Sequence, residues 1–339
     1  MTPHAIKSLF SRVTGQAPGA YWLRAHQQAR SIPYRAVATF NRLTGNEPSQ
    51  RIAVFGCPRS GTTWVAEQLL GPGKAPMLWE PLNVAMTPEP ARLGFSLLSC
   101  LGPHHADAGK VQYVRDVFAA RRLTHYLAQA TSVGSLLRPR TVLVKFTNGN
   151  TVLPWFVKHF PDVPTVLVLR HPAAVVASIL RHPNWNEYRL HSIRRALENP
   201  DILHRFPALA TCPLEDHAAL LAAYWAVSNL VPLANTSKTQ CFRVSYEQLF
   251  DRPEAFAGLA GRLGLEWTQG TKDPRAASYS SRASDIARAS TRWIDDLSGA
   301  ERRVIEATVE RFGFGTIFRT DRPTAEDYCS LALPAVELR

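Results

Sequence analysis

The sequence predicts an α/β fold in which helices cover both faces of a central parallel sheet, giving three layers. Short, almost continuous apolar runs at 52–55, 141–144, 165–169 and 241–244 are typical of strands buried on both faces. Segments with helical periodicity follow these runs, and such alternation indicates a parallel sheet. The length of 339 residues and the apolar content of 45% suit one large domain or two small ones. No repeat or low-complexity tract is visible, which favours one.

The net charge indicates the kind of partner, and the cysteines indicate the redox environment. The net charge of +12 favours an anionic partner, which includes nucleotides, nucleic acids, acidic glycans and anionic lipid surfaces. The five cysteines are scattered and contain no C-x-x-C pair, as expected in a reducing, cytoplasmic setting without disulfides or a zinc site. We find no apolar run near the roughly 18 residues of a membrane span, and no signal-peptide pattern.

Residues 1–50 are interpreted as a basic N-terminal helical arm, and residues 51–339 as a single α/β domain. The arm has six Lys or Arg residues before its first acidic residue, Glu47, and Ile6, Leu9, Phe10 and Val13 recur at helical spacing. Packing on the domain is one interpretation. Peripheral contact with an anionic membrane and an organelle transit peptide are the alternatives.

The segment that organises the chain joins the first strand to the first helix. Gly56 and Gly61 have nearly the spacing of the P-loop pattern G-x-x-x-x-G-K-[ST], but Thr62 replaces the lysine. Arg59 supplies a cation inside the loop. The loop and the helix N-terminus therefore indicate a P-loop-like site that binds a phosphate. The missing lysine argues against a kinase that handles a nucleoside triphosphate. An ordinary strand–turn–helix corner is the alternative.

The run Pro58-Arg-Ser-Gly-Thr-Thr-Trp64 resembles the 5′-phosphosulfate loop of sulfotransferases that use 3′-phosphoadenosine-5′-phosphosulfate (PAPS). Arginine in this position is frequent in the bacterial and carbohydrate-type branch. The resemblance implies that the donor is bound by this loop and that Trp64 stacks on its adenine. The loop residues so implied are Arg59, Ser60, Gly61, Thr62, Thr63 and Trp64.

Charged residues follow two further apolar runs. Glu80 ends the run 77–79, which would place it near Arg59 if the two strands are neighbours. Glu-Pro-Leu here resembles carbohydrate sulfotransferases, which implies that Glu80 is the catalytic base; an exposed loop glutamate is the alternative. Lys145 resembles the family's lysine at the end of the third strand. The histidine base of the cytosolic branch is replaced by Thr147, which shifts that role to Glu80.

A second phosphate motif follows the run 165–169. Arg170 and Ser178 form Arg-x-Pro-x5-Ser, which resembles the family's 3′-phosphate motif, with His171 where aspartate is common. Arginine offers forked donors to a phosphate. The alternative is an arginine at a strand end beside a buried serine. Tyr246 matches the family's Tyr-Glu-Asp-Leu segment, which implies a place near the adenine.

The remaining segments are assigned more loosely. Residues 84–140, with a helix expected over 114–137, and residues 181–222 are interpreted as acceptor-binding insertions; a solvated surface is the alternative. Helices are also expected over 152–160, 173–180 and 216–234. In the tail, Arg282, Arg288 and Arg292 precede Trp293. The family resemblance implies that one arginine here closes over the 3′-phosphate; Arg288 is taken as the candidate without excluding the other two, and a solvated basic helix face is the alternative.

The sequence thus predicts transfer of a sulfuryl group from PAPS to a hydroxyl of a glycan, a glycolipid or a small metabolite. Arg59, the loop backbone and Lys145 would stabilise the donor, and Glu80 would accept the proton. His171 and His182 are the rival bases. No metal is required. A P-loop nucleotide or small-molecule kinase is the alternative function. A nucleic-acid-binding protein is disfavoured because the arginines are spread along the chain.

Overall fold

The computed structural model describes residues 30–71, 75–183, 185–266 and 291–338. Its centre is a five-stranded sheet with the order β2-β3-β1-β4-β5, in which every pairing is parallel. The strands are β1 (Gln50–Gly56), β2 (Met77–Trp79), β3 (Thr141–Phe146), β4 (Thr165–Leu169) and β5 (Phe242–Ser245). Each forms where an apolar run predicted it, so the expected parallel α/β fold is confirmed.

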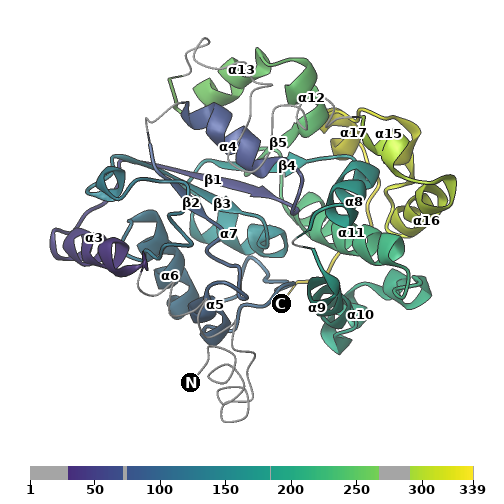
Figure 1. Ribbon diagram of the computed structural model, residues 1–339, viewed down its shortest axis with the longest axis horizontal. Helices are drawn as coiled ribbons and strands as arrows, with labels where there is room; N and C mark the ends of the chain where they lie inside the picture. Colours follow the sequence, from purple (N-terminus) through teal and green to yellow (C-terminus); the bar gives the residue numbers. More distant parts are fainter. Residues whose placement is uncertain (1–29, 72–74, 184, 267–290, 339) are drawn as a thin grey trace, which may run out of the picture.

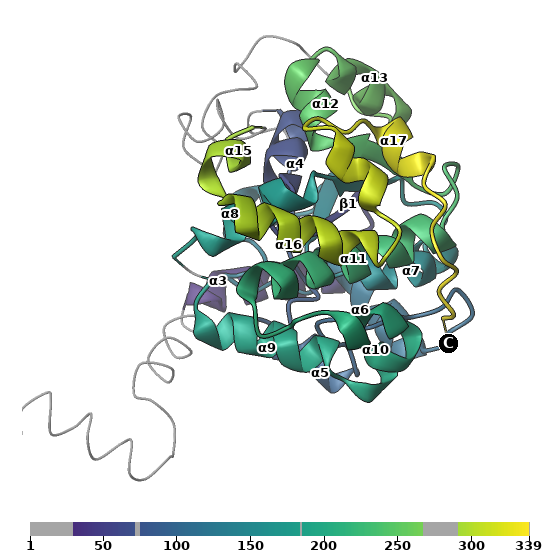
Figure 2. The same ribbon diagram turned by 90° about the vertical axis from the view of Figure 1, so that its right-hand side faces the viewer.

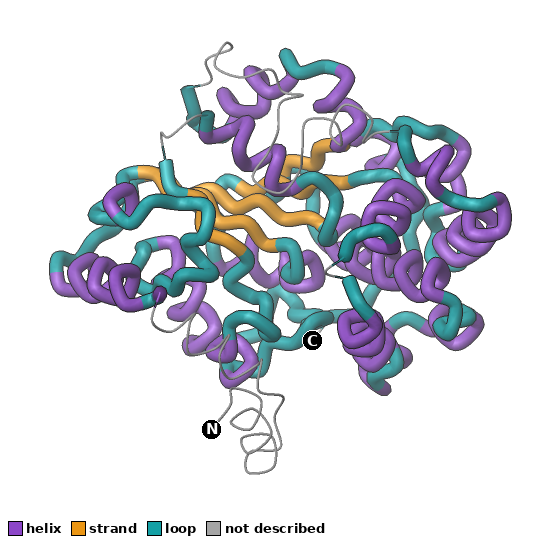
Figure 3. The backbone as a smooth tube through the Cα atoms, viewed as in Figure 1, coloured by secondary structure: helices purple, strands orange, loops and turns teal. Residues whose placement is uncertain are grey.

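Helices cover both faces of the sheet (Figures 1 and 3). On one face lie α4 (Thr62–Leu70), α12 (Tyr246–Asp251) and α13 (Ala255–Arg262). On the other lie α6 (Ala108–Phe118), α7 (Leu153–His159), α8 (Pro172–Leu180) and α11 (His217–Asn235). Successive residues of a strand point to opposite faces of the sheet, so the sheet separates two hydrophobic cores. Ile52 and Val54 belong to the first core, on the side of α4, and Ala53 and Phe55 belong to the second, on the side of α11.

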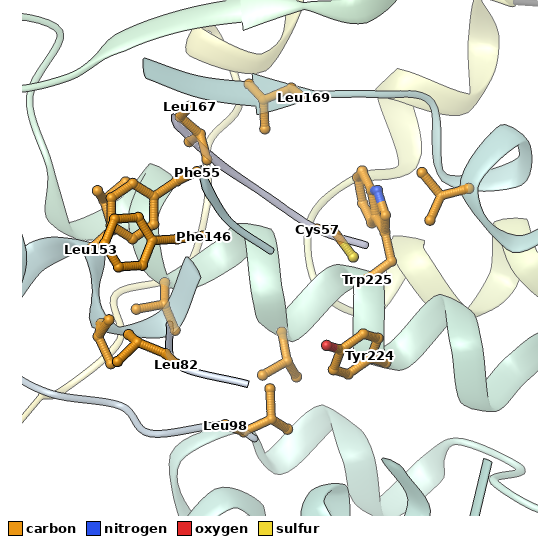
Figure 4. Packing of buried hydrophobic residues seen from close by; sticks show 14 of the residues in the cluster. Phe55, Cys57, Leu82, Leu98, Phe146, Leu153, Leu167, Leu169, Tyr224 and Trp225 are labelled. Carbon is orange, nitrogen blue, oxygen red and sulfur yellow. The ribbon is translucent and has the colours of Figure 1, made fainter. Parts of the chain in front are cut away.

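The second core is the larger one. Phe55 and Phe146 stack with ring centroids 4.5 Å apart, and Leu153 packs beside them (Figure 4). Trp225 on α11 is fully buried, and its indole N–H donates to the carbonyl of Arg170 across 3.2 Å. This bond fixes the end of β4 against the core, at Arg170, which the sequence predicts to bind a phosphate.

The helix α11 is 19 residues long and has a mean hydropathy of 1.3, so by length and composition alone it would qualify as a membrane span. It is the one such helix within the described ranges. It packs against α8 and against α16 (Gly299–Glu310), as Figure 2 shows. Most of its residues are buried inside the protein, as expected of the central helix of a folded domain.

One predicted helix is wrong in its bounds. The expected helix over 114–137 begins earlier, at Ala108 with Asp107 as its N-cap, and ends at Phe118. Ala120 then adopts φ 51°, and Arg121 N–H bonds back to the Asp116 carbonyl across 2.8 Å. Turns follow up to the short η1 (Gly134–Leu136). A left-handed alanine closes the helix here, and periodicity gives no sign of it.

The expected helices over 152–160, 173–180 and 216–234 are confirmed by α7, α8 and α11. The remaining helical elements lie around the two main layers. They are α3 (Ile32–Leu43), α5 (Pro88–Arg92), η2 (Asn150–Val152), α9 (Glu187–Leu197), α10 (Pro200–Arg205), η3 (Pro207–Thr211), α15 (Trp293–Asp296), η4 (Gly315–Arg319) and α17 (Ala325–Cys329).

Within the expected N-terminal arm, residues 30–50 are described, and they include α3. The apolar residues Ile6, Leu9, Phe10 and Val13 lie outside the described residues. The amide of Asn41 on α3 donates to the carbonyls of Ala120 and Leu136, so this helix is bonded to the turns that follow α6.

Candidate active site

The predicted site residues gather at the carboxyl edge of the sheet, because all five strands end there. The loop at 57–61 follows β1, and Glu80 follows β2. Lys145 is the penultimate residue of β3, Arg170 follows β4 and Tyr246 follows β5. This is the edge where open α/β sheets bind ligands.

The loop after β1 depends on its two glycines. Gly61 precedes α4 with φ 87°, and a Cβ added to it would lie 2.3 Å from Cδ2 of Tyr246. A Cβ on Gly56 would lie 2.4 Å from Cγ2 of Thr62. The glycines therefore allow a tyrosine ring and the helix to pack directly on the loop. The first N–H groups of a helix have no acceptor within the helix, so the start of α4 suits an anion.

Arg59 connects the two predicted phosphate motifs. Its backbone is left-handed, with φ 69°. Its Nε donates to Ser178 Oγ across 3.0 Å, and its carbonyl accepts from Arg170 Nη1 across 2.8 Å. Next to it, Ser60 Oγ is buried without a hydrogen-bond partner within the described part of the chain. The first loop, Arg170 and Ser178 thus form one polar cluster.

Aromatic rings surround this cluster. The Arg170 guanidinium lies 4.4 Å from the ring centroid of Tyr246, which is in turn 5.1 Å from that of Trp64. Trp64 also packs against Phe256 at 5.2 Å and is only 3% exposed, yet it borders the cavity. Both predicted adenine contacts are therefore beside the loop, with Trp64 largely part of the core.

Lys145 lies between the loop and the carboxylate. Its Nζ is 3.0 Å from Thr63 Oγ1 and 3.1 Å from Glu80 Oε1, and it lies 3.2 Å from the ring centroid of Trp79. The side chain is almost fully buried. Burial lowers the pKa of Lys145, and the charge of Glu80 opposes this shift. A buried ammonium is thus placed where negative charge from a phosphate would be stabilised.

Glu80 is held by hydrogen bonds on both carboxylate oxygens. Tyr126 Oη and Asn83 Nδ2 donate to its Oε2 across 2.9 and 3.1 Å, and Asn83 Nδ2 also lies 2.8 Å from Tyr126 Oη. Burial favours a raised pKa, but the charge of Lys145 and hydrogen bonds from Thr147, Lys145 and Tyr126 outweigh it. The pKa of Glu80 is therefore lowered, and the carboxylate is ionised at neutral pH.

The condition under which Glu80 was expected near Arg59 is not met. The strands that carry Arg59 and Glu80 are not neighbours, because β3 lies between β1 and β2. Glu80 reaches the loop through Lys145 instead. His171, a rival base, is fully buried and stacks on Trp293 at 4.5 Å, and it does not itself border the cavity. Burial and the charge of Arg170 lower its pKa to about 3.

His182, the other rival base, borders the cavity. Burial lowers its pKa, and the charges of Arg59 and Arg189 add to that shift. In the tail, Arg282 and Arg288 lie outside the described residues, so the predicted role of Arg288 stays a prediction. Arg292 and Trp293 border the cavity.

One large cavity, of about 1600 Å³, joins these groups. Its walls come from the loop, from residues 79–86 and from residues 181–193, so parts of both expected acceptor insertions contribute. Sequence reasoning missed Tyr126 and Arg189 on this wall. No motif marks either residue, and Tyr126 is 46 residues from Glu80. Within the described ranges, no group of three or more His, Cys, Asp or Glu side chains is arranged to hold a metal ion.

A family model described as "Sulfotransferase family" matches residues 51–269, which is more than half of the chain. The chain belongs to the sulfotransferase family. The match includes the loop, Glu80, Lys145, Arg170 and Tyr246, and it ends before the tail arginines. This confirms the resemblance seen in the loop sequence.

Solved structures similar to this sulfotransferase include the sulfotransferase domain from the curacin biosynthetic pathway. It is 16% identical with a TM-score of 0.41, covering 78% of this chain and 98% of that domain. A sulfotransferase from Alicyclobacillus acidocaldarius is 15% identical with a TM-score of 0.34, covering 81% of this chain and 99% of that one. No curated protein matches this sulfotransferase significantly in sequence.

Proposed function

We propose that this sulfotransferase moves a sulfuryl group from PAPS to a hydroxyl of an acceptor. The observation that carries the proposal is the position of Lys145, whose Nζ contacts both Thr63 of the loop and Glu80. A phosphosulfate in the loop and a hydroxyl at the carboxylate would then meet at one ammonium group.

The donor end of the cavity suits PAPS. The α4 N-terminus and Arg59 would hold the 5′-phosphosulfate. The Ser60 hydroxyl, which has no hydrogen-bond partner among the described residues, offers one more donor. Arg170 and Ser178 would hold the 3′-phosphate, because a guanidinium fork matches phosphate oxygens. Tyr246 and Trp64 would contact the adenine. Arg288 would close over the 3′-phosphate.

The chemistry is an in-line displacement at sulfur. The acceptor oxygen attacks the sulfur, the bond from sulfur to the 5′-phosphate oxygen breaks, and 3′-phosphoadenosine-5′-phosphate (PAP) leaves. Arg59 and Lys145 stabilise the negative charge that develops on the leaving phosphate. Glu80, which is ionised, accepts the hydroxyl proton.

Calorimetry with PAP, AMP and Mg²⁺-ATP tests the donor. We expect PAP to bind far more tightly than AMP or ATP, because only PAP fills both phosphate motifs. Equal affinity for PAP and AMP would remove the 3′-phosphate assignment. Tight Mg²⁺-dependent ATP binding without PAP binding would instead favour the kinase alternative. Transfer of radiolabelled sulfate from PAPS to compounds in a cell extract would then identify the acceptor.

We further propose a cytoplasmic enzyme that acts on a glycan, a glycolipid or a small metabolite. The basic residues of the N-terminal arm favour contact with an anionic membrane. Sedimentation of the full chain with phosphatidylglycerol vesicles, but not with phosphatidylcholine vesicles, would support this contact. Equal recovery with both would reject it.

A further inference from the structure

We propose that the acceptor carries an oxyanion, a carboxylate or a phosphate, which Arg189 binds while the hydroxyl lies at Glu80. This rests on the proposed sulfuryl transfer and narrows its acceptor to a class. The anionic group would be recognised by a residue of α9, outside the donor-binding motifs. The sequence motifs give no indication of this contact.

The cavity is also lined by residues outside the donor motifs. Besides the loop, Arg170 and Tyr246, its walls include a group on and before α9, formed by Trp185, Tyr188 and Arg189. Tyr188 is 75% exposed and Trp185 is partly buried. This wall therefore offers two aromatic faces and one cation to whatever lies against it.

The other cations around the cavity already have roles. Arg181 and Arg292 both form ion pairs with Asp296, and Lys145 pairs with Glu80. Arg59 and Arg170 belong to the donor cluster. Arg189 forms no ion pair with any carboxylate in the described part of the chain. Among the described residues, no carboxylate therefore neutralises the positive charge of Arg189.

The position of Arg189 is defined from two directions. Its guanidinium lies 5.6 Å from the ring centroid of Trp185, which holds it along the cavity wall. The charge of Arg189 also acts on two neighbouring residues. Burial and Glu80 raise the pKa of Tyr126, and Arg189 opposes this rise. Burial lowers the pKa of His182, and Arg189 adds to this fall. Tyr126 bonds to Glu80. Arg189 therefore borders the same cavity as Glu80 and acts electrostatically on Tyr126, the residue that bonds to that carboxylate.

This placement favours an anionic acceptor for an electrostatic reason. An acceptor oxyanion would be repelled both by Glu80 and by the phosphates of the donor. A cation at the acceptor wall offsets that repulsion, and a guanidinium can bind a carboxylate or phosphate in bidentate fashion. A neutral acceptor would derive no such benefit from Arg189.

The test measures binding to the PAP-saturated protein by calorimetry. The probes are phenyl β-glucuronide and phenyl β-glucoside, which differ only in the carboxylate at C6, and phenyl β-glucoside 6-phosphate. We compare the wild type with Arg189→Gln. Arg195→Gln is the matched control, because Arg195 is an exposed arginine of the same helix that does not border the cavity.

We expect one or both anionic probes to bind more tightly than the glucoside, by roughly five- to tenfold. Arg189→Gln should abolish this preference and Arg195→Gln should retain it. The two anionic arms distinguish a carboxylate from a phosphate ester. If neither anionic probe exceeds the glucoside, or if the preference survives in Arg189→Gln, the inference is overturned. A failure of the proposed function would show differently, as loss of PAP binding itself.

Discussion

Tyr126 donates its hydroxyl hydrogen to Glu80 Oε2 across 2.9 Å. The second oxygen of the same carboxylate faces Lys145 at 3.1 Å. Glu80 itself has φ 46°, a strained left-handed backbone for a glutamate. The carboxylate is therefore fixed in place, with its charged form favoured, at the edge of a cavity that also contains the phosphate loop.

Glu80→Gln should lower turnover by about 10²- to 10⁴-fold, the contribution of a positioned general base. The amide keeps the size of the side chain but does not accept the proton. PAP affinity, measured by calorimetry, should stay within a few-fold of the wild type. A Glu80→Gln enzyme with near-normal turnover, together with an inactive His182→Asn enzyme, would transfer the role of base to His182.

Tyr126→Phe should move the acid limb of the rate profile to higher pH. The pKa of Glu80 lies below its ordinary value of 4.5, and the carboxylate accepts protons only above that pKa, so activity is lost as pH falls through it. Removing a hydrogen bond to the charged form raises the pKa and hence the limb. The control is Tyr328→Phe, because the buried hydroxyl of Tyr328 has no hydrogen-bond partner within the described ranges. If the acid limb of the pH–rate profile lies at the same pH in Tyr126→Phe as in the wild type, Glu80 is not the base whose titration limits the rate.

Arg170→Ala should weaken PAP binding by about 1.5–3 kcal/mol, the range for charge-assisted hydrogen bonds. Arg59→Ala should reduce turnover more than donor affinity, because its contact strengthens as the leaving phosphate gains charge. Calorimetry with PAP and steady-state kinetics with PAPS separate the two effects. A purely KM effect in Arg59→Ala would contradict this division of roles.

Gly61→Ala should destabilise the protein. A left-handed backbone costs a non-glycine residue on the order of 1–3 kcal/mol, and the new methyl group would meet the Tyr246 ring at 2.3 Å. Thermal or urea unfolding measures the loss. Gly258→Ala on α13 is the control, because no atom lies near its Cβ position and a helix favours alanine by about 0.4–1 kcal/mol. Equal stability of the two variants would show that the loop adapts.

The fold could be predicted from sequence because the central strands β1, β3 and β4 contain short apolar runs that are buried on both faces. The loop at 57–61 was identifiable as a candidate phosphate site because such sites need glycines and donors at fixed spacing. Strand order has no comparable local signal. Whether β1 and β2 are neighbours was therefore open from the sequence, and β3 lies between them, with its Lys145 linking the residues that follow them.

The partners of the site were less accessible to sequence reasoning. Tyr126 meets Glu80 only because the chain turns back after Ala120, whose positive φ no periodicity predicts. His171 follows a strand end like a functional residue, but its ring is packed between Trp293 and Phe318. Adjacency in sequence to Arg170 gave no information about which way the ring points.

The bond from Arg170 to the Arg59 carbonyl means that the anion-binding loop is preorganised. Arg59 requires an unfavourable left-handed conformation, and the neighbouring guanidinium holds it there as soon as the chain has folded. An incoming anion therefore does not bear the entropy cost of ordering the loop, and its binding energy remains available for affinity. Two recognition elements that lie 111 residues apart in the chain consequently behave as a single rigid receptor.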